Sequence, residues 1–236
     1  MCGRIAQHRA EVAYLKWLHT SGRVARPPDE TNIERYNVPP STQVRLLHLD
    51  DDGLRFDPMR WGYLPFWAIG KSKRPPAINA RTESLASTSF WREAKKHGRA
   101  LVPADGWFEW VKHPTNKKLK QPYFIQQKSK EPMLFAAVGR FARGEEAQPD
   151  EAGFAIVTHH SDAGMVDIHD RRPVVLPADV AMEWMDQATP AEQASDLIRH
   201  HAVEVEDFEW YPVSPEVGKV SNQGPHLIVP LDKPAF

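Results

Sequence analysis

The single cysteine of the 236-residue chain is Cys2, directly behind Met1. Removal of Met1 gives Cys2 a free α-amine beside its thiol, a 1,2-aminothiol that no internal cysteine can form. An unperturbed α-amine has a pKa of roughly 7.7–8.0, so part of it is a neutral nucleophile at neutral pH. The amine can form a Schiff base with an aldehyde, and the thiol can then close a five-membered thiazolidine ring intramolecularly. Cys2 therefore suits an aldehyde, or an acyl group attacked by sulfur, although a terminal residue is often only a frayed end.

Three other side chains stand in contexts that favour proton transfer or positioning. Glu109 lies between Phe108 and Trp110, and a carboxyl group among apolar neighbours can have a raised pKa and serve as an acid. His169 lies between two aspartates and titrates near neutral pH. The amide of Asn79 can orient a reacting group or merely cap a helix. An outward-facing strand position for Glu109 and a turn with ion pairs for His169 remain the structural alternatives.

Metal and phosphate motifs are missing from the sequence. His159–His160 and His200–His201 are adjacent pairs, whose side chains point apart on a strand. There is neither an HExxH motif nor a cysteine pair, and no glycine-rich phosphate loop. We therefore expect no metal and no cofactor.

The elements that must position these residues are mostly strands. We expect helices within residues 8–19, 79–98 and 189–198, the last with Thr189 as the N-cap of a capping box. Alternating or β-branched patterns predict strands within residues 43–49, 54–67, 99–112 (two strands around the turn 104–106), 123–127, 133–141 and 153–158, with extended segments at 201–214 and 225–231.

The order of these elements indicates the fold class. Strands outnumber helices and do not alternate with them, which predicts an α+β fold. We expect one domain over residues 1–236, with a curved, mainly antiparallel β-sheet that forms a pseudo-barrel and a few flanking helices. Residues 112–122 form a basic hairpin tip and residues 144–153 an acidic loop, and neither is a convincing domain boundary.

Composition restricts the class of protein further. No apolar run approaches the roughly 20 residues of a membrane helix, no secretory signal is present, and one cysteine fits a reducing compartment. We expect a cytoplasmic monomer. Residues 1–140 contain 24 Lys and Arg against 13 Asp and Glu, whereas residues 141–236 contain 6 against 18. Such asymmetry indicates either a polyanion-binding face or two mutually attracting halves.

Seven blocks of the sequence resemble the SOS-response-associated peptidase family, whose members are abasic-site processing proteins. They are MCGR (1–4), RYNVPPS (35–41), WGYLPFW (61–67), INARTES (78–84), RALVPADGWFEW (99–110), IVTHHSDAGMVDIHDRRPVVL (156–176) and VSNQG (220–224). They follow the order of the family, and several are long and unusual.

The resemblance implies a function. Members of the family bind single-stranded DNA with an abasic site, and the mature N-terminal cysteine traps the sugar aldehyde as a thiazolidine that shields the lesion during the DNA damage response. Cys2 is then the nucleophile, Glu109 handles protons in ring opening and Schiff-base formation, and His169 assists proton transfer and crosslink reversal. Asn79 positions the cysteine and the lesion. The word peptidase refers to removal of the residue before the cysteine, and a DNA-bound protein would be associated with the nucleoid.

The same resemblance implies a set of DNA contacts. Arginines suit bidentate phosphate contacts and aromatic faces accept any base. The residues matched in this way are Arg4, Pro40, Trp67, Arg81, Trp110, Thr158 and Arg171.

Two other functions are compatible with parts of the sequence. An N-terminal-nucleophile glutamine amidohydrolase also begins Met-Cys-Gly, but normally continues with isoleucine where this chain has Arg4. A non-catalytic single-strand binder would leave Cys2 incidental. A Cys2-dependent release of ammonia from glutamine would favour the first, and full DNA association after Cys2→Ala the second.

Overall fold

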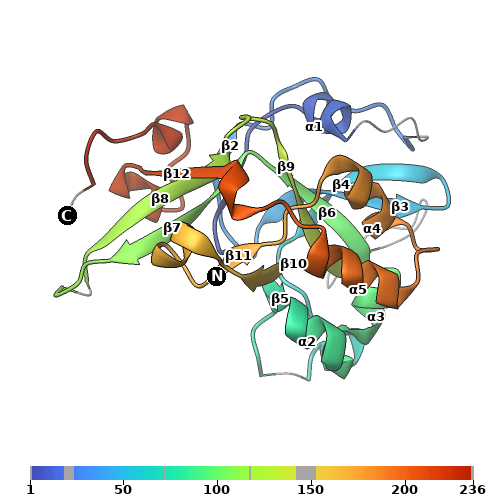
Figure 1. Ribbon diagram of the computed structural model, residues 1–236. Coiled ribbons are helices and arrows are strands. Elements are labelled where there is room, and N and C mark those ends of the chain that lie inside the picture. Colours follow the sequence, from blue (N-terminus) through green and yellow to red (C-terminus); the bar gives the residue numbers. More distant parts are fainter. Residues whose placement is uncertain (1, 19–23, 72, 117, 142–152, 235–236) are drawn as a thin grey trace.

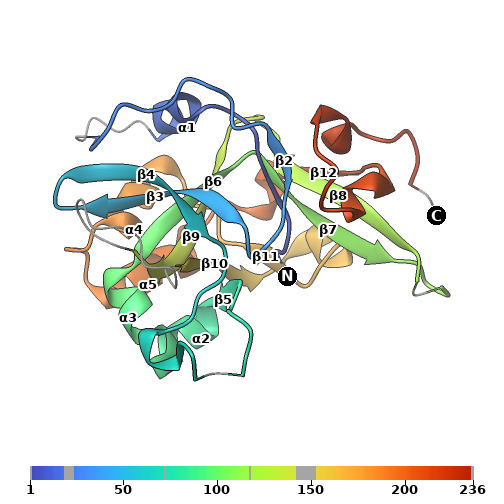
Figure 2. The same ribbon diagram turned by 180° about the vertical axis from the view of Figure 1, so that it is seen from behind.

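The computed structural model describes residues 2–18, 24–71, 73–116, 118–141 and 153–234 (Figures 1 and 2). Its strands form two sheets. The smaller is a five-stranded antiparallel sheet with the order β12-β8-β7-β1-β2. Its strands are β1 (Ile5–Gln7), β2 (Arg35–Val38), β7 (Gly106–Lys112), β8 (Lys120–Gln127) and β12 (Phe208–Pro212).

The larger sheet has seven strands, in the order β11-β10-β9-β6-β3-β4, with β5 paired to β10. Only the β5–β10 pair within this sheet is parallel. The strands are β3 (Gln43–Asp50), β4 (Gly53–Arg60), β5 (Asn79–Arg81), β6 (Arg99–Ala104), β9 (Met133–Arg140), β10 (Gly153–His160) and β11 (Arg171–Pro173).

Short helices lie beside the larger sheet, and α2 to α5 gather at one end of the molecule (Figure 1). They are α1 (Glu11–Trp17), α2 (Thr82–Ser87), α3 (Arg92–His97), α4 (Ala178–Met185) and α5 (Ala191–His200). Trp91, Trp184 and Leu197 from this group pack with sheet residues such as Leu101 in one buried cluster. No helix of the described segments is long and apolar enough to cross a membrane.

The mainly antiparallel α+β class is confirmed, with the strands divided between two open sheets rather than one curved sheet. The strands on either side of Asp105 are confirmed but belong to different sheets, so the chain crosses between the sheets at this turn. The Asp105 carboxylate stabilises the crossing by accepting hydrogen bonds from the His8 backbone N–H at 2.7 Å and the Tyr14 hydroxyl at 2.6 Å.

Several local expectations are wrong. Thr189 does not cap α5, because its hydroxyl donates to the Glu183 carbonyl oxygen at 2.8 Å at the end of α4, and Pro190 is the N-cap. Helix α4 was not expected. Residues 79–98 hold a short strand and two helices rather than one, and residues 225–228 form a 3₁₀ turn. Most of the acidic loop at 144–153 lies outside the described residues.

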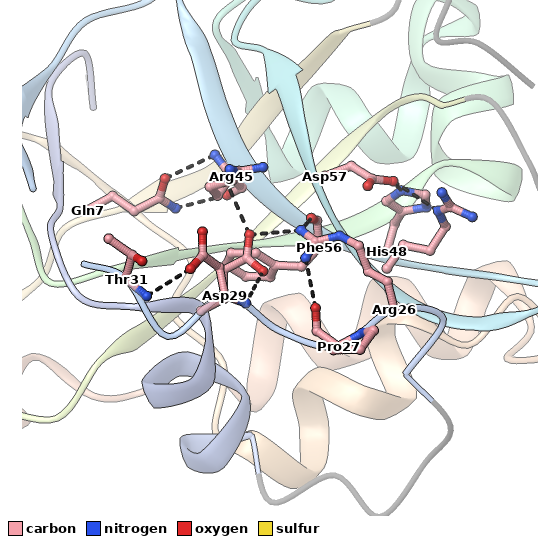
Figure 3. Close-up of polar contacts among 11 residues, drawn as sticks. Gln7, Arg26, Pro27, Asp29, Thr31, Arg45, His48, Phe56 and Asp57 are labelled. Atoms are coloured by element: carbon pink, nitrogen blue, oxygen red, sulfur yellow. Dashed lines mark hydrogen bonds and ion pairs between the residues drawn. The ribbon is translucent and has the colours of Figure 1, made fainter. Parts of the chain in front are cut away.

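The buried side chain of Gln7 connects the two sheets at β1. Its Nε2 donates to the Arg45 carbonyl oxygen at 2.9 Å, and its Oε1 accepts from the Arg45 N–H at 3.0 Å (Figure 3). Nε2 also donates to the Pro103 carbonyl oxygen at 2.8 Å. Arg45 is on β3 and Pro103 on β6, so Gln7 fixes a strand of the smaller sheet to two strands of the larger one. β1 begins three residues after Cys2, so this contact anchors the strand that leads away from Cys2.

Candidate active site

Cys2 lies between the two sheets, and its side chain is 0% exposed. It packs in the buried cluster that also contains Trp61, Ile156 and Met165. The segment before β1 runs beside β7, because the Phe108 N–H donates to the Arg4 carbonyl oxygen at 2.9 Å and Ile5 pairs with Trp107. Continuation of this antiparallel register brings Cys2 alongside the β7 residues that follow Phe108.

Asn79 contacts Cys2 directly. Its Nδ2 donates a hydrogen bond to the Cys2 carbonyl oxygen at 2.9 Å. Asn79 is held in turn at the first residue of β5, in register with Ile156 of β10. The hydrogen bond therefore joins the N-terminal segment to the larger sheet, and the helix cap that was the alternative for Asn79 is not its role, since the N-cap of α2 is Arg81.

Glu109 is buried, with 5% of its surface exposed, which excludes the outward-facing alternative. Burial raises the pKa of its carboxyl group to about 7, and the negative charge of Asp170 acts in the same direction. A carboxyl group with a pKa near 7 exists in both forms at neutral pH, so it can both donate and accept a proton.

The Cys2 thiol and Glu109 influence each other electrostatically. Burial raises the pKa of the thiol well above its usual range, and the negative charge of Glu109 raises it further, whereas a hydrogen bond from the Arg4 backbone N–H opposes the shift. Cys2 therefore carries its proton at neutral pH. Sulfur can act as a nucleophile here only when a base removes that proton, and Glu109 is a titratable group whose charge acts on the thiol.

His169 lies in the turn between the 3₁₀ helix Ala163–Asp167 and β11. Its Nδ1 is 3.0 Å from the Arg171 backbone nitrogen, which donates to it, and 2.8 Å from Asp170 Oδ1. Burial lowers the pKa of His169, so the ring is neutral at neutral pH and accepts from the amide. A protonated ring would instead donate from Nδ1 to Asp170, so proton uptake exchanges one partner for another. The negative charge of Asp170 also raises the pKa of Glu109, so the His169 turn acts electrostatically on Glu109.

Arg171 and Thr158 are buried where the sequence indicated DNA contacts. The Arg171 guanidinium is paired with both carboxylate oxygens of Glu83, at 2.9 and 3.1 Å, and donates to the Thr158 carbonyl oxygen at 2.8 Å. Arg171 is 4% exposed and Thr158 1%. A phosphate group could bind Arg171 only by displacing the Glu83 carboxylate from it. The DNA contacts of Arg171 and Thr158 stay predictions.

A cavity of about 430 Å³ opens next to this ion pair. Arg81 at the N-cap of α2 is exposed and lines it, together with His160 and Asp170. The cavity is therefore lined by residues that closely follow Asn79 and His169 in the chain. Its wall contains the exposed guanidinium group of Arg81, which suits an anion.

Arg4 and Trp110 form a second cationic and aromatic surface. The Arg4 guanidinium carbon lies 5.5 Å from the centre of the Trp110 ring, a cation–π contact. Arg4 Nη1 also donates to the Val217 carbonyl oxygen at 2.8 Å and to Asn37 Oδ1. Both side chains are partly exposed.

Trp67 is 51% exposed, and the neighbouring Phe66, which the sequence did not single out, is 62% exposed. The edge of Phe90 meets Trp67, with 6.3 Å between the ring centres. Pro40 is half-buried in the connection between β2 and β3. The DNA contacts expected of Trp67 and Pro40 stay predictions, as does any contact of Phe66.

The structure thus brings Cys2, Asn79, Glu109 and the His169 turn together from four separate parts of the chain. Within the described residues, no group of three or more His, Cys, Asp or Glu side chains has the geometry of a metal site. Sequence reasoning missed Glu83, whose only signal was its place in INARTES, and it assigned no role to Asn37 or Gln223.

Comparison with known proteins identifies the family of the chain. The profile of the SOS response associated peptidase (SRAP) family matches residues 1–220. The chain is 44% identical over 233 residues to the abasic site processing protein YedK of Escherichia coli, covering 98% of this chain and 100% of YedK. It is 29% identical to the abasic site processing protein HMCES of Rattus norvegicus, covering 98% of this chain and 76% of that protein.

Solved structures show the same fold. A phage-related protein from Bordetella bronchiseptica superposes with a TM-score of 0.74 at 39% identity, covering 90% of this chain and 94% of that one. A protein from Bacteroides thetaiotaomicron has a TM-score of 0.76 at 19% identity and shares the fold. The family profile spans the whole arrangement from Cys2 to β12, and the chain belongs to the SOS response associated peptidase family.

Proposed function

We propose that the protein covalently traps the aldehyde of an abasic site in single-stranded DNA through the amine and thiol of Cys2. The observation that carries the proposal is the seating of Cys2: its carbonyl group is held by Asn79 at 2.9 Å, and its thiol is close enough to Glu109 for that charge to raise the thiol pKa. The named function of the relatives, processing of abasic sites, supports the choice of substrate.

Removal of Met1, by an aminopeptidase or by the protein itself, frees the α-amine of Cys2. The amine nitrogen attacks C1′ of the ring-opened sugar, and a C–N bond forms. The former aldehyde oxygen takes one proton from the amine nitrogen and one from protonated Glu109 and leaves as water, which gives a protonated imine and the Glu109 carboxylate. A carboxyl group with a pKa of about 7 suits this step.

Ring closure then makes the product durable. The Cys2 thiol loses its proton to the Glu109 carboxylate, sulfur bonds to C1′ of the protonated imine, and the C=N π electron pair moves to nitrogen, so the ring nitrogen is neutral and Glu109 is protonated again. One water is lost in the whole sequence, and the crosslink is a thiazolidine. The neutral His169 ring assists these proton transfers. Its neighbour Asp170 acts on the same step, because its negative charge raises the pKa of Glu109.

DNA binding in this proposal uses the exposed Arg81 beside the 430 Å³ cavity and the Arg4–Trp110 surface. An abasic site has no base to read, so selectivity comes from the aldehyde reaction and from the space left by the missing base. The protein acts as a monomer in the cytoplasm, associated with the nucleoid when bound.

The test uses a single-stranded oligonucleotide with one abasic site. Wild-type protein gives a species of low mobility that survives denaturation, and Cys2→Ala abolishes it. Cys2→Ser is the matched variant: like Cys2→Ala it keeps the α-amine but lacks the thiol, and its hydroxyl preserves the size and polarity of the side chain. It therefore forms an imine, which borohydride traps but denaturation without borohydride releases. The absence of any denaturation-resistant species with wild-type protein refutes the proposal, and unchanged non-covalent binding by Cys2→Ala in that case supports a non-catalytic binder. Ammonia release from glutamine that depends on Cys2 would instead favour the amidohydrolase.

A further inference from the structure

The VSNQG segment near the C-terminus lies against the edge of β2, far in sequence from every residue of the proposed site. Gln223 Oε1 accepts from the backbone N–H groups of Tyr36 and Asn37 at 3.0 and 3.1 Å, and its Nε2 donates to the Asn37 carbonyl oxygen at 3.0 Å. Since β2 is the edge strand of the smaller sheet, the side chain of Gln223 pairs with its backbone as a neighbouring strand would.

Asn37 continues this connection from the other side. Its side chain is fully buried, and Nδ2 donates to the carbonyl oxygens of Val217, Lys219 and Asn222, each at 3.1 Å. A single amide group therefore holds three successive parts of the 217–222 segment. These hydrogen bonds fix the position of the Val217 carbonyl oxygen, which also accepts a hydrogen bond from a second side chain.

The second side chain that donates to Val217 is Arg4. The Val217 carbonyl oxygen and Asn37 Oδ1 both accept hydrogen bonds from Arg4 Nη1. We call Asn37, Val217 and Gln223 the clasp. The clasp holds one edge of the Arg4 guanidinium group, and the face of that group lies against the Trp110 ring. Arg4 Nε is buried and has no hydrogen-bond partner within the described part of the chain.

Arg4 is two residues from Cys2, and its backbone is part of the Cys2 environment. Its N–H hydrogen-bonds the thiol, and its carbonyl oxygen accepts from Phe108. A displacement of Arg4 therefore displaces the sulfur relative to Glu109 on β7. Misplacement of reacting groups by about 1 Å can cost on the order of 100-fold in rate.

We infer that the clasp is a positioning element of the reaction: it seats Arg4 and, through Arg4, holds the thiol of Cys2 against Glu109. For its effect on crosslinking this inference rests on the proposed function, but the seating itself is a property of the free protein. Gln223 is the suitable site for a test, because its side chain is exposed and its replacement leaves the core intact.

The first measurement needs no DNA. Cys2 is the only cysteine, so alkylation by iodoacetamide reports on the accessibility and ionisation of this one thiol. Both increase when the thiol leaves its buried place near Glu109. We expect Gln223→Ala to raise the alkylation rate roughly tenfold, because opening of the N-terminal segment becomes easier. Gln193→Ala, which removes another exposed glutamine on α5, leaves the rate at the wild-type value.

A double-mutant cycle separates seating through Arg4 from general loosening. Arg4→Ala and Gln223→Ala each raise the alkylation rate, and in the Arg4→Ala background Gln223→Ala adds less than about twofold, because the two act through one contact. Gln223→Glu keeps the acceptor for both N–H groups but loses the donor to Asn37, and gives an intermediate rate. An unchanged rate in Gln223→Ala, or an undiminished effect in the Arg4→Ala background, overturns the inference.

The same variants are then assayed for crosslinking at saturating abasic-site DNA and at a temperature where all are folded. We expect the rate with Gln223→Ala to fall roughly tenfold, while a purely structural role would lower the melting temperature alone. If wild-type protein forms no crosslink but the alkylation cycle shows the coupling, the proposed function fails and the seating stands. If crosslinking is intact while alkylation does not respond, the seating fails alone.

Discussion

At the scale of single residues, burial sets the acidity of the two groups to which we assign the chemistry, Glu109 and Cys2. Burial moves the pKa of Glu109 up to about 7 and the pKa of the thiol further up, so the carboxylate becomes a base of useful strength beside a proton that it can remove. The same desolvation that creates the reactivity costs stability, since an ionised Glu109 is unfavourable in the folded protein.

Glu109→Gln tests both consequences. The folded carboxyl retains its proton between pH 4.5 and about 7, where the unfolded chain has lost it, so the Glu109 contribution to stability is complete below about pH 4.5 and declines as the pH rises to 7. We expect Glu109→Gln to raise the free energy of unfolding at pH 8 by about 2–3 kcal/mol and to change it little at pH 4. Urea denaturation at both pH values measures this.

The same variant removes the proton donor. Crosslinking by Glu109→Gln is slower at every pH, and the limb of the pH–rate profile with a pKa near 7 disappears, while affinity for an intact single strand is kept. Glu131→Gln, at an exposed glutamate, is the matched control. If the limb of the pH–rate profile with a pKa near 7 persists in Glu109→Gln, a group other than Glu109 causes it.

Asn79 acts on position rather than on protons. Asn79→Asp keeps the shape but replaces the Nδ2 donor to the Cys2 carbonyl oxygen by an acceptor. We expect the crosslinking rate to fall by about 10- to 100-fold, with the affinity for undamaged single strands unchanged. Asn32→Asp, an exposed asparagine, serves as control. Equal loss of rate and affinity would show that Asn79 instead supports DNA binding.

At the scale of elements, β1 depends on a buried glutamine that joins two sheets. Gln7→Leu leaves two carbonyl oxygens and one N–H without their partner, at Arg45 and Pro103. Unsatisfied buried groups cost roughly 1–3 kcal/mol each, so we expect a loss of about 3 kcal/mol in the free energy of unfolding after partial relaxation. Urea denaturation measures it, with Gln193→Leu as an exposed control, and a loss below 1 kcal/mol would mean that Gln7 is not a structural link.

Strands could be predicted from the sequence better than their pairing. The alternating pattern of β3 and the β-branched runs of β9 and β10 have local causes, so their positions were predicted within a few residues. The assignment of β6 and β7 to different sheets depends on contacts of Asp105 with His8 and Tyr14, which no local pattern contains. The Thr189 cap was wrong for the same reason: a more distant acceptor on α4 takes the hydroxyl.

At the scale of the whole molecule, the site is assembled by long-range contacts. The choice of Cys2, Asn79, Glu109 and His169 rests on motifs that resemble a family, since their spacing in the sequence does not show that they meet, and their catalytic roles stay predictions. The bidentate Glu83–Arg171 pair and the clasp around Asn37 could not be predicted, because each joins segments more than 80 residues apart.

The charge asymmetry also belongs to this scale. Residues 1–140 hold an excess of basic side chains, among them Arg4 and Arg81. We expect affinity for an undamaged single strand to fall with salt, with a slope of about −0.7 per neutralised phosphate. Arg81→Ala should make the slope less negative by about 0.7, and Arg81→Lys should not change it. A slope that Arg81→Ala leaves unchanged would remove Arg81 from the DNA contacts.

The central claim, that Cys2 uses both its amine and its thiol, is tested most directly by mass spectrometry of the crosslink formed with abasic-site DNA. We predict the mass of the protein without Met1 plus that of the oligonucleotide minus one water, and an N-terminal peptide whose adduct neither reacts with a thiol reagent nor gains mass with borohydride. An adduct on a lysine, a crosslink that retains Met1, or a Cys2 that remains free to alkylation after crosslinking would contradict the account.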